Sequence, residues 1–407
     1  MDDANLMEKI VSLCKRRGFV FPGSEIYGGL AGTYDYGPLG VVLKENVERL
    51  WLQMFRDDRD DMYGVDAAIL MNPKVWEASG HVQTFADPLS DGKMFNTMFK
   101  TSVGVGEEVS TVYMRPETAG GIFTNFKNVV DALHPKMPFG IAQLGKAFRN
   151  EIAPRDFIFR LRELSQMEVE YFVKPTDWEQ AFEEWRKLMH LFAAAVGLSQ
   201  TMLHELEVPD GDRAHYSKRT IDFEFDYPFG RKELWGLAYR TDFDLSAHAN
   251  ASSIELSYLD EETKEKFIPH VIEPSLGVDR TILAILTSAY REDALGGETR
   301  TYLAFSPKIA PVKAMVSPLL KNKPELVAKA REVRAELKKV HSAIAWDDNG
   351  NIGKRYRRQD EIGTPFCITI DFETLEDDTV TLRHRDTGTQ ERLTISEAAS
   401  RIRSAVQ

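Results

Sequence analysis

Hydrophobic side chains recur every three or four residues in several long stretches of this chain, which is the spacing of one face of a helix. In the first stretch, Leu43, Val47 and Leu50 fall on the same side. The spacing predicts helices at residues 39–56, 178–196, 278–290, 324–340 and 396–405.

Other stretches alternate polar and hydrophobic residues or are rich in β-branched and aromatic residues, which is typical of strands. They predict strands at residues 63–71, 139–149, 162–173, 220–227, 232–240, 267–273, 310–316, 367–371 and 379–384. The second and third of these flank a short loop that contains Pro154, so we expect an antiparallel pair. Residues 87–106 are rich in turn-forming residues and carry no clear periodicity.

The order of the elements changes around residues 292–301, a polar stretch centred on Gly296 and Gly297. Beyond it, strands and helices alternate, which is typical of a small α/β domain. We therefore predict two domains, residues 1–298 and 299–407.

The composition and charge of the chain limit the classes of function that we expect. The chain has 407 residues, 43% of them hydrophobic, and a net charge of -12, so overall charge does not favour non-specific nucleic-acid binding. No apolar run is long enough for a membrane span, and the first 17 residues do not resemble a secretory signal. Cys14 and Cys367 are far apart, which predicts reduced thiols, a cytoplasmic location and no cysteine-based zinc site.

The first candidate for chemistry is the segment from Phe148 to Glu151, with Arg160 across the loop. The fork of Arg149 can hold a phosphate and a carboxylate together, and Glu151 can accept from an amino group on the same face. A surface hairpin with scattered charges explains these residue types equally well.

A second candidate spans residues 269–280, where a strand would present Glu273 and Ser275 on one face. Arg280 then falls in the first turn of the predicted helix, and a helix N-terminus with an arginine suits a polyphosphate. The alternative is an ordinary βα unit with a surface arginine. A third segment, residues 114–118, is by itself typical of a helix start.

The densest basic cluster runs from Lys354 to Arg358. A tyrosine among four cations suits single-stranded RNA, because bases stack on aromatic rings and phosphates pair with cations. The alternative is a solvated end of a helix or loop.

Together these segments resemble the ordered motifs of the class II aminoacyl-tRNA synthetases, with motif 1 at about 39–73, motif 2 at about 145–173 and motif 3 at about 269–290. Within that class the chain is similar to the homodimeric type of glycyl-tRNA synthetase, from about residue 19 to about residue 402. The segments that carry this resemblance are Arg115-Pro-Glu-Thr-Ala, Gly145-Lys-Ala-Phe-Arg-Asn-Glu-Ile, Lys232-Glu-Leu-Trp-Gly, Arg240-Thr-Asp-Phe-Asp-Leu, His270-Val-Ile-Glu-Pro-Ser and Gly353-Lys-Arg-Tyr-Arg-Arg-Gln-Asp-Glu-Ile-Gly-Thr-Pro.

The resemblance implies an α+β fold, with a class II catalytic domain over residues 1–298, built as an antiparallel sheet flanked by helices, and a smaller α/β anticodon-binding domain over residues 299–407. It implies a glycine–tRNA ligase that uses ATP and Mg²⁺ to form glycyl-adenylate and then transfers glycine to the 3′ end of tRNA(Gly). The implied assembly is a homodimer in the cytoplasm without membrane contact.

The resemblance also implies roles for individual residues. Arg149 and Arg280 would be the catalytic residues. The implied ATP-binding residues are Arg149, Asn150, Glu151, Phe159, Arg160, Leu164, Glu233, Leu234, Gly277 and Arg280, with Glu233 as the candidate Mg²⁺ contact. The implied glycine-binding residues are Glu117, Gln166, Glu168, Arg240, Glu273 and Ser275, and the implied tRNA-binding residues are Lys354, Arg355, Tyr356, Arg357 and Arg358.

Three features depart from the family pattern. The stretch from Asp87 to Phe95 is short where relatives often carry a longer insert. Gly120 stands where the family usually has glutamine, and Leu164 stands where it usually has an aromatic residue that stacks on adenine. We expect weaker ATP binding from the loss of stacking, by on the order of 1 kcal/mol.

Two alternatives remain at this point. One is a synthetase-like dimer that binds nucleic acid without catalysis, which would not need the charge set Arg149, Glu151, Arg160, Glu168, Glu273 and Arg280. The other is a class II ligase for another small amino acid. Glu117, Glu168, Glu273 and Ser275 together favour glycine over it, because a larger side chain needs a pocket in their place.

Overall fold

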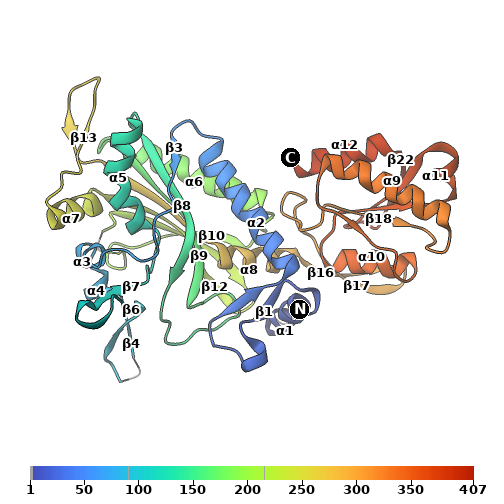
Figure 1. Cartoon of the computed structure of the whole chain (residues 1–407), viewed down its shortest axis with the longest axis horizontal. Coiled ribbons are helices and arrows are strands. Elements are labelled where there is room, and N and C mark those ends of the chain that lie inside the picture. The colour runs from blue at the N-terminus through green and yellow to red at the C-terminus, as the bar shows by residue number, and fades with distance from the viewer. Residues whose placement is uncertain (1–2, 90, 215) are drawn as a thin grey trace.

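The computed structural model describes residues 3–89, 91–214 and 216–407. Figure 1 shows a larger domain that contains the N-terminus and a smaller domain that contains the C-terminus, joined through a narrow region. Each has its own hydrophobic core.

A seven-stranded sheet forms the centre of the larger domain, in the order β10-β11-β12-β15-β9-β8-β3. All neighbours pair antiparallel except β3 and β8, which are parallel. The strands are β3 (Met62–Gly64), β8 (Phe139–Phe148), β9 (Glu163–Val173), β10 (Leu203–Glu207), β11 (Arg219–Tyr227), β12 (Gly230–Thr241) and β15 (His270–Gly277).

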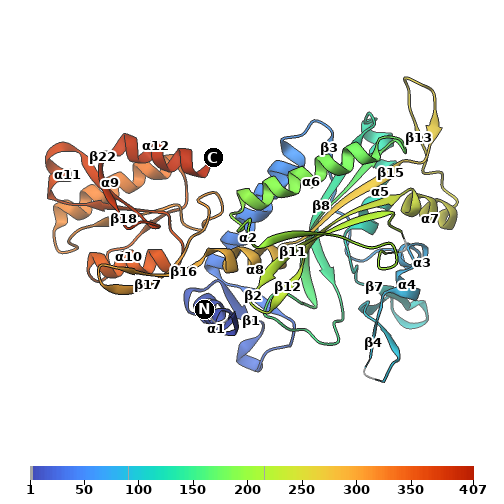
Figure 2. The same cartoon turned by 180° about the vertical axis from the view of Figure 1, so that it is seen from behind.

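The two faces of this sheet have different roles. On one face, Met167, Val169 and Tyr171 of β9 join the core formed with α2 (Pro38–Leu52), α6 (Trp178–Ala195) and α8 (Val278–Ala289). Figure 2 shows α6 lying across the sheet on this side. Successive strand residues point to opposite faces, so the even-numbered residues Gln166 and Glu168 face the other side.

That other face is covered only in part. Helices α5 (Ala119–Leu133) and α7 (Phe243–Ser252) pack on one end of it through a second core that includes Phe172. The rest stays open and carries the polar residues described below.

A long excursion connects β3 to α5. It contains α3 (Lys74–Ala78), α4 (His81–Thr84), β4 (Ala86–Pro88), β5 (Met94–Asn96), β6 (Lys100–Val103), η3 (Gly106–Glu108) and β7 (Ser110–Tyr113). The predicted strand 63–71 is wrong beyond Gly64. The chain leaves the sheet there, and Leu70 returns only as an isolated bridge to Met114.

The N-terminal segment lies against both domains. It consists of α1 (Asp3–Arg17), β1 (Val20–Pro22), η1 (Glu25–Tyr27) and β2 (Tyr34–Tyr36), and a π-helical turn η2 (Gln53–Asp57) extends α2. In α1, Lys9 pairs with Glu292 at 2.9 Å, and Arg17 pairs with Glu361 of the smaller domain.

The predicted boundary segment 292–301 is a hairpin. Strand β16 (Tyr290–Leu295) follows α8 without a loop, and it pairs with β17 (Glu298–Leu303). Arg300 of β17 is buried and donates to Asp293 at 2.9 Å, to Asp360 at 3.3 Å and to the carbonyl of Arg385. The hairpin therefore packs into the smaller domain.

The smaller domain has a five-stranded sheet in the order β19-β18-β20-β21-β22, with parallel and antiparallel pairs. Its elements are β18 (Ala314–Pro318), α9 (Pro324–Val340), β19 (Ile344–Trp346), α10 (Ile352–Glu361), β20 (Phe366–Ile370), α11 (Phe372–Asp377), β21 (Thr379–His384), β22 (Gln390–Thr394) and α12 (Ile395–Val406). A small hairpin of β13 (Tyr258–Leu259) and β14 (Lys266–Phe267) precedes β15 in the larger domain. The predicted α+β class is confirmed.

Candidate active site

Two adjoining cavities lie on the open face of the large sheet. The first lies between the ends of β8 and β9, the loop between them and the start of α8, and the second lies over β9, β12 and β15. Arg149, Gln166, Glu233 and Ser275 line both cavities.

The residues assigned to ATP and to glycine separate into these two cavities. Every residue of the predicted ATP set lines the first cavity except Asn150. Every residue of the predicted glycine set lines the second cavity except Arg240. Two of these residues, Gln166 and Ser275, also line the first cavity. The structure thus brings together residues from segments that are far apart in the chain.

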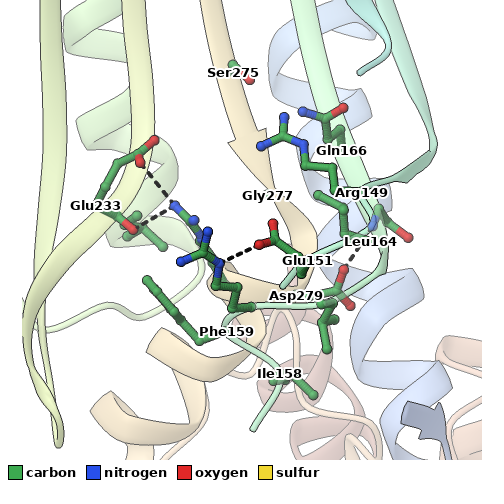
Figure 3. Close-up of a pocket in the computed structure, with 15 residues that line it drawn as sticks. Arg149, Glu151, Ile158, Phe159, Leu164, Gln166, Glu233, Ser275, Gly277 and Asp279 are labelled. Carbon is green, nitrogen blue, oxygen red and sulfur yellow. Dashed lines mark hydrogen bonds and ion pairs between the residues drawn. The ribbon is translucent and has the colours of Figure 1, made fainter. Parts of the chain in front are cut away.

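Arg149 follows the last residue of β8 and points into the first cavity (Figure 3), and it lines the second cavity as well. Its Nε donates to the carbonyl of Pro116 at 3.0 Å, and its guanidinium lies 5.3 Å from the centre of the Phe85 ring. Nη1 and Nη2 have no hydrogen-bond partner among the described residues, so both remain available to an anion.

Two ion pairs cross the first cavity (Figure 3). Arg160 donates from Nε to Glu151 at 2.6 Å, and Nη1 of Arg280 lies 3.2 Å from Oε2 of Glu233. The Arg280 guanidinium also lies 4.5 Å from the centre of the Phe159 ring. Asp279, to which we gave no role from the sequence, lines the same cavity and accepts from the backbone N–H of Ser165.

The floor of the second cavity is built around Glu168. Its Oε1 accepts from Ser275 Oγ at 2.7 Å, and its Oε2 accepts from the backbone N–H of Thr118 at 3.1 Å and from the hydroxyl of Thr118. Burial raises the pKa of Glu168, and so does the charge of Glu117, while Thr118 and Ser275 oppose the shift.

Glu273 is tied to Arg240 at 2.5 Å, and Arg240 makes two further 2.8 Å bonds to Asp244. Arg240 is buried and lies outside the lining of the cavity, so it supports Glu273 from behind. Burial, opposed by Arg240 and aided by the charges of Glu168 and Glu117, raises the pKa of Glu273 to about 8.

Glu170 lies two residues beyond Glu168 on the same face of β9. It is fully buried, and neither of its carboxylate oxygens has a hydrogen-bond partner in the described chain. Burial raises the pKa of Glu170 well above its usual range, and the charge of Glu273 adds to this shift. Burial therefore favours the neutral form of Glu170.

The excursion between β3 and α5 supplies three side chains that the sequence did not single out. His81 lies 3.3 Å from Glu117, Phe85 packs under Arg149, and Asp87 accepts from Arg160 at 3.1 Å. These residues precede or begin the stretch for which we predicted no element. No periodicity marks them, and only their three-dimensional contacts reveal them.

The structure shows the surroundings of the three positions at which the chain departs from the family pattern. A Cβ atom on Gly120 would lie 2.9 Å from the ring of Trp76, so the indole fills the space that a side chain at position 120 would need. Leu164 lines the first cavity. The short stretch around Asp87 and Phe95 is the β4–β5 hairpin.

The basic cluster forms the middle of α10 and is largely engaged within the domain. Arg355 is only 1% exposed and donates to Ser317 and to the carbonyls of Pro318, Asp348 and Gly350. Its predicted tRNA contact is therefore wrong, because its guanidinium points inward.

The other members of the cluster differ in exposure. Arg358 pairs with Asp347 at 2.8 Å, the hydroxyl of Tyr356 contacts Thr369 at 2.6 Å, and Arg357 donates to a backbone carbonyl of the junction hairpin. Lys354 is the exposed member.

The described residues include no metal-binding cluster, no disulfide and no membrane-spanning helix. Across the described ranges, no three or more His, Cys, Asp or Glu side chains are grouped so that they could hold a metal ion. Both cysteines are buried free thiols. None of the helices in the described part of the chain combines the length and apolar composition that a membrane span requires.

Comparisons with known proteins place this site in a family. Residues 99–289 match the tRNA synthetase class II core domain (G, H, P, S and T), and residues 313–405 match the anticodon binding domain. A glycine–tRNA ligase from Lachnospira eligens is 48% identical, with 96% of this chain and 97% of the relative covered. The chain belongs to the glycine–tRNA ligase family.

Other members of the family are similarly close. The ligase from Clostridium tetani is 46% identical over 98% of both chains, and that from Macrococcus caseolyticus is 47% identical over 96% of both. The alignment with the Lachnospira protein spans 451 positions, which exceeds the 407 residues here, so that relative contains residues without a counterpart in this chain.

Proposed function

We propose that this protein is a glycine–tRNA ligase of compact form, in which the first cavity binds ATP and the second binds glycine. The observation that carries this assignment is the position of Arg149, whose free guanidinium nitrogens face both cavities. One cation at that point can hold the α-phosphate of ATP and the carboxylate of the amino acid together.

The first step is attack of the glycine carboxylate on the α-phosphorus, which gives glycyl-adenylate and releases pyrophosphate. Negative charge develops on the phosphoryl oxygens, and Arg149 stabilises it from a fixed position. The terminal ribose hydroxyl of tRNA then attacks the adenylate carbonyl and displaces AMP. Positioning and charge carry such chemistry without a protein nucleophile.

Within the first cavity, Glu151 accepts from the adenine amino group, Leu164 packs on the adenine ring, and Arg160 and Arg280 hold the outer phosphates. Each of these side chains lines the cavity. Both arginines are already paired with carboxylates, so ATP must replace those contacts when it binds.

The second cavity suits an ammonium group with no side chain behind it. Glu117, Glu168 and Glu273 surround the space, and Ser275 orients Glu168. A single extra methyl group gives only about 1–3 kcal/mol of discrimination in an apolar pocket. A cage of carboxylates stabilises the ammonium directly and leaves little room for a Cβ atom.

Members of this family use ATP together with Mg²⁺. Glu233 fits such an ion, because its half-exposed carboxylate lines both cavities and Mg²⁺ takes one or two carboxylates together with phosphate oxygens. The bound ion would neutralise phosphate charge during adenylate formation.

The smaller domain would bind the anticodon region of tRNA(Gly), with Lys354 as the exposed cation of the basic cluster. The motif 1 segment, which includes α2, would form a homodimer contact. The compact β4–β5 hairpin would stand in place of the longer insert of relatives. Reduced buried thiols suit a cytoplasmic enzyme.

The test is ATP–pyrophosphate exchange with glycine, alanine, serine, proline and threonine. We expect exchange with glycine only. Arg149→Ala should abolish it, while Arg186→Ala, which removes an arginine paired with Glu205 on α6 and β10, should not. Absence of exchange with every amino acid would favour a non-catalytic nucleic-acid-binding protein, and equal exchange with alanine or serine would overturn the glycine assignment.

A further inference from the structure

A short segment of the excursion, residues 81–87, touches three residues of the proposed site. His81 contacts Glu117, Phe85 contacts Arg149, and Asp87 contacts Arg160. No residue of this segment lines either cavity, so it acts on the site from behind. His81 makes the most specific of these contacts.

The ring of His81 is held by contacts with four residues. It packs edge-on against Trp76 with 5.4 Å between ring centres, and at a tilt against Phe85 with 5.3 Å between ring centres. Its Nδ1 lies 2.7 Å from Ser79 Oγ, and its Nε2 lies 3.3 Å from Oε2 of Glu117. The imidazole is therefore aimed at the carboxylate and cannot turn without losing these contacts.

The surroundings provide for both charge states of the ring. When His81 is neutral, the Ser79 hydroxyl can donate to Nδ1, which leaves the proton on Nε2 to be donated to Glu117. When His81 is charged, Nδ1 can donate to Ser79, whose hydroxyl then turns to the carbonyl of Trp76 at 3.5 Å. In either state, Nε2 donates to Glu117.

We propose that His81 is a positioning residue of the glycine site, which holds the Glu117 carboxylate in the orientation that receives the ammonium group. This inference rests on the proposed function. Glu117 lies between β7 and α5, outside any regular element, and the 3.3 Å contact with His81 is the only hydrogen bond or ion pair of its carboxylate among the described residues.

Charge adds to this argument. Burial raises the pKa of Glu117, but His81 lowers it through its charge and its hydrogen bond, and Arg240 and Arg149 lower it further, to about 2. The groups that face Glu117 from the other elements are Glu168 on β9, Glu273 on β15, Tyr216 before β11 and His248 on α7. Without His81, burial and the neighbouring carboxylates favour the protonated acid, which cannot pair with an ammonium group.

The test compares His81→Phe, which keeps a ring between Trp76 and Phe85, with His81→Gln, which keeps a donor but no charge. KM and kcat for glycine and KM for ATP would be measured by pyrophosphate exchange from pH 6 to pH 8.5, together with thermal unfolding. The matched control is His204→Phe, because His204 pairs with Asp226 at 2.7 Å outside both cavities.

We expect His81→Phe to raise KM for glycine roughly 10- to 100-fold, the usual effect of losing a hydrogen bond to a charged group, with kcat and KM for ATP changed less than about twofold. In this variant, KM for glycine should depend more steeply on pH than in the wild type, because the loss of His81 raises the pKa of Glu117. His81→Gln should recover most of the loss, and the control should match the wild type.

Two results would overturn the inference. One is a KM for glycine in His81→Phe within about twofold of the wild type. The other is an equal, pH-independent loss for glycine and ATP in both His81 variants, with lowered thermal stability, which would assign His81 to folding alone. Absence of glycine-dependent exchange in the wild type would instead overturn the proposed function on which the inference rests.

Discussion

Arg160 and Glu151 form an ion pair, with 2.6 Å between Nε of the arginine and Oε2 of the glutamate. Asp87 contacts the same guanidinium at 3.1 Å. Both partners of the ion pair are proposed to bind ATP, one at the phosphates and the other at adenine. The two carboxylates therefore compete with the nucleotide for one arginine.

Asp87→Ala should lower KM for ATP. Its carboxylate holds Arg160 but does not line the cavity, and partly exposed ion pairs contribute about 0.2–1 kcal/mol, so we expect a change of roughly two- to fivefold in pyrophosphate exchange. Asp91→Ala, which removes an exposed pair with Lys93 in the same hairpin, is the control. A higher KM for ATP in Asp87→Ala would mean that Asp87 holds Arg160 in its productive position.

Leu164→Phe should also lower KM for ATP, by roughly fivefold. Leu164 lines the first cavity, and an aromatic ring there would add a stacking contribution of about 1 kcal/mol on adenine. Leu191→Phe makes the same exchange at an exposed position on α6 and should leave KM unchanged. An unaltered KM for ATP in Leu164→Phe would argue against adenine packing on this residue.

Binding of glycine should release protons near neutral pH. The pKa of Glu273 is raised to about 8 and that of Glu168 is also raised, so the carboxylates hold a proton at pH 7 that a bound ammonium group would displace. Calorimetry at pH 7 in buffers of different ionisation enthalpy should give a buffer-dependent heat. That dependence should shrink towards pH 9, because Glu273 is ionised there before glycine binds. A heat independent of the buffer at pH 7 would contradict the raised pKa values.

Gly120→Gln should destabilise the protein and weaken glycine binding. The new side chain would displace Trp76, whose ring packs against His81, and overpacking in a core costs about 1–3 kcal/mol of unfolding free energy. Gly211→Gln, where a Cβ meets nothing within 4 Å, should be neutral in thermal unfolding. If Gly120→Gln kept both the stability and the KM for glycine, Trp76 would not be a rigid part of the site.

Substitutions in the basic helix α10 should have two different kinds of effect. Lys354→Ala should raise KM for tRNA in aminoacylation without changing pyrophosphate exchange, because Lys354 is exposed and remote from the cavities. Arg355→Met should lower thermal stability, because it leaves buried carbonyls unpaired at a cost of about 1–3 kcal/mol each. An Arg355→Met protein with native stability and weakened tRNA binding would restore the role first predicted for this arginine.

Strong periodicity of hydrophobic residues was sufficient to predict the regular helices and strands. Helix α9 and strand β21 have the predicted bounds, because each presents one continuous apolar face to a core. The predicted strand 267–273 begins too early and stops short, since β15 runs through Pro274 to Gly277. Pairing with β12 and β9 continues the strand where local pattern suggested an end.

Some residues of the site were predictable from the sequence, and others were not. Arg149 and Glu273 stand in motifs whose order in the chain is informative. His81 stands in a turn-rich region, and its partner Glu117 is remote in sequence, so only tertiary packing reveals the pair. Likewise, a linear run of charges does not show which side of α10 faces inward, so the burial of Arg355 was not predictable.

Helix α8 carries Arg280 near its start and passes directly into β16, whose hairpin is locked into the smaller domain through Arg300. Helix α1 joins the same two domains on another side through Lys9 and Arg17. The separation between the proposed adenylate site and the anticodon-binding domain is therefore set by folded elements and not by a flexible linker. An RNA that reaches both must span a fixed distance, so its length, as well as its bases, decides whether it is accepted.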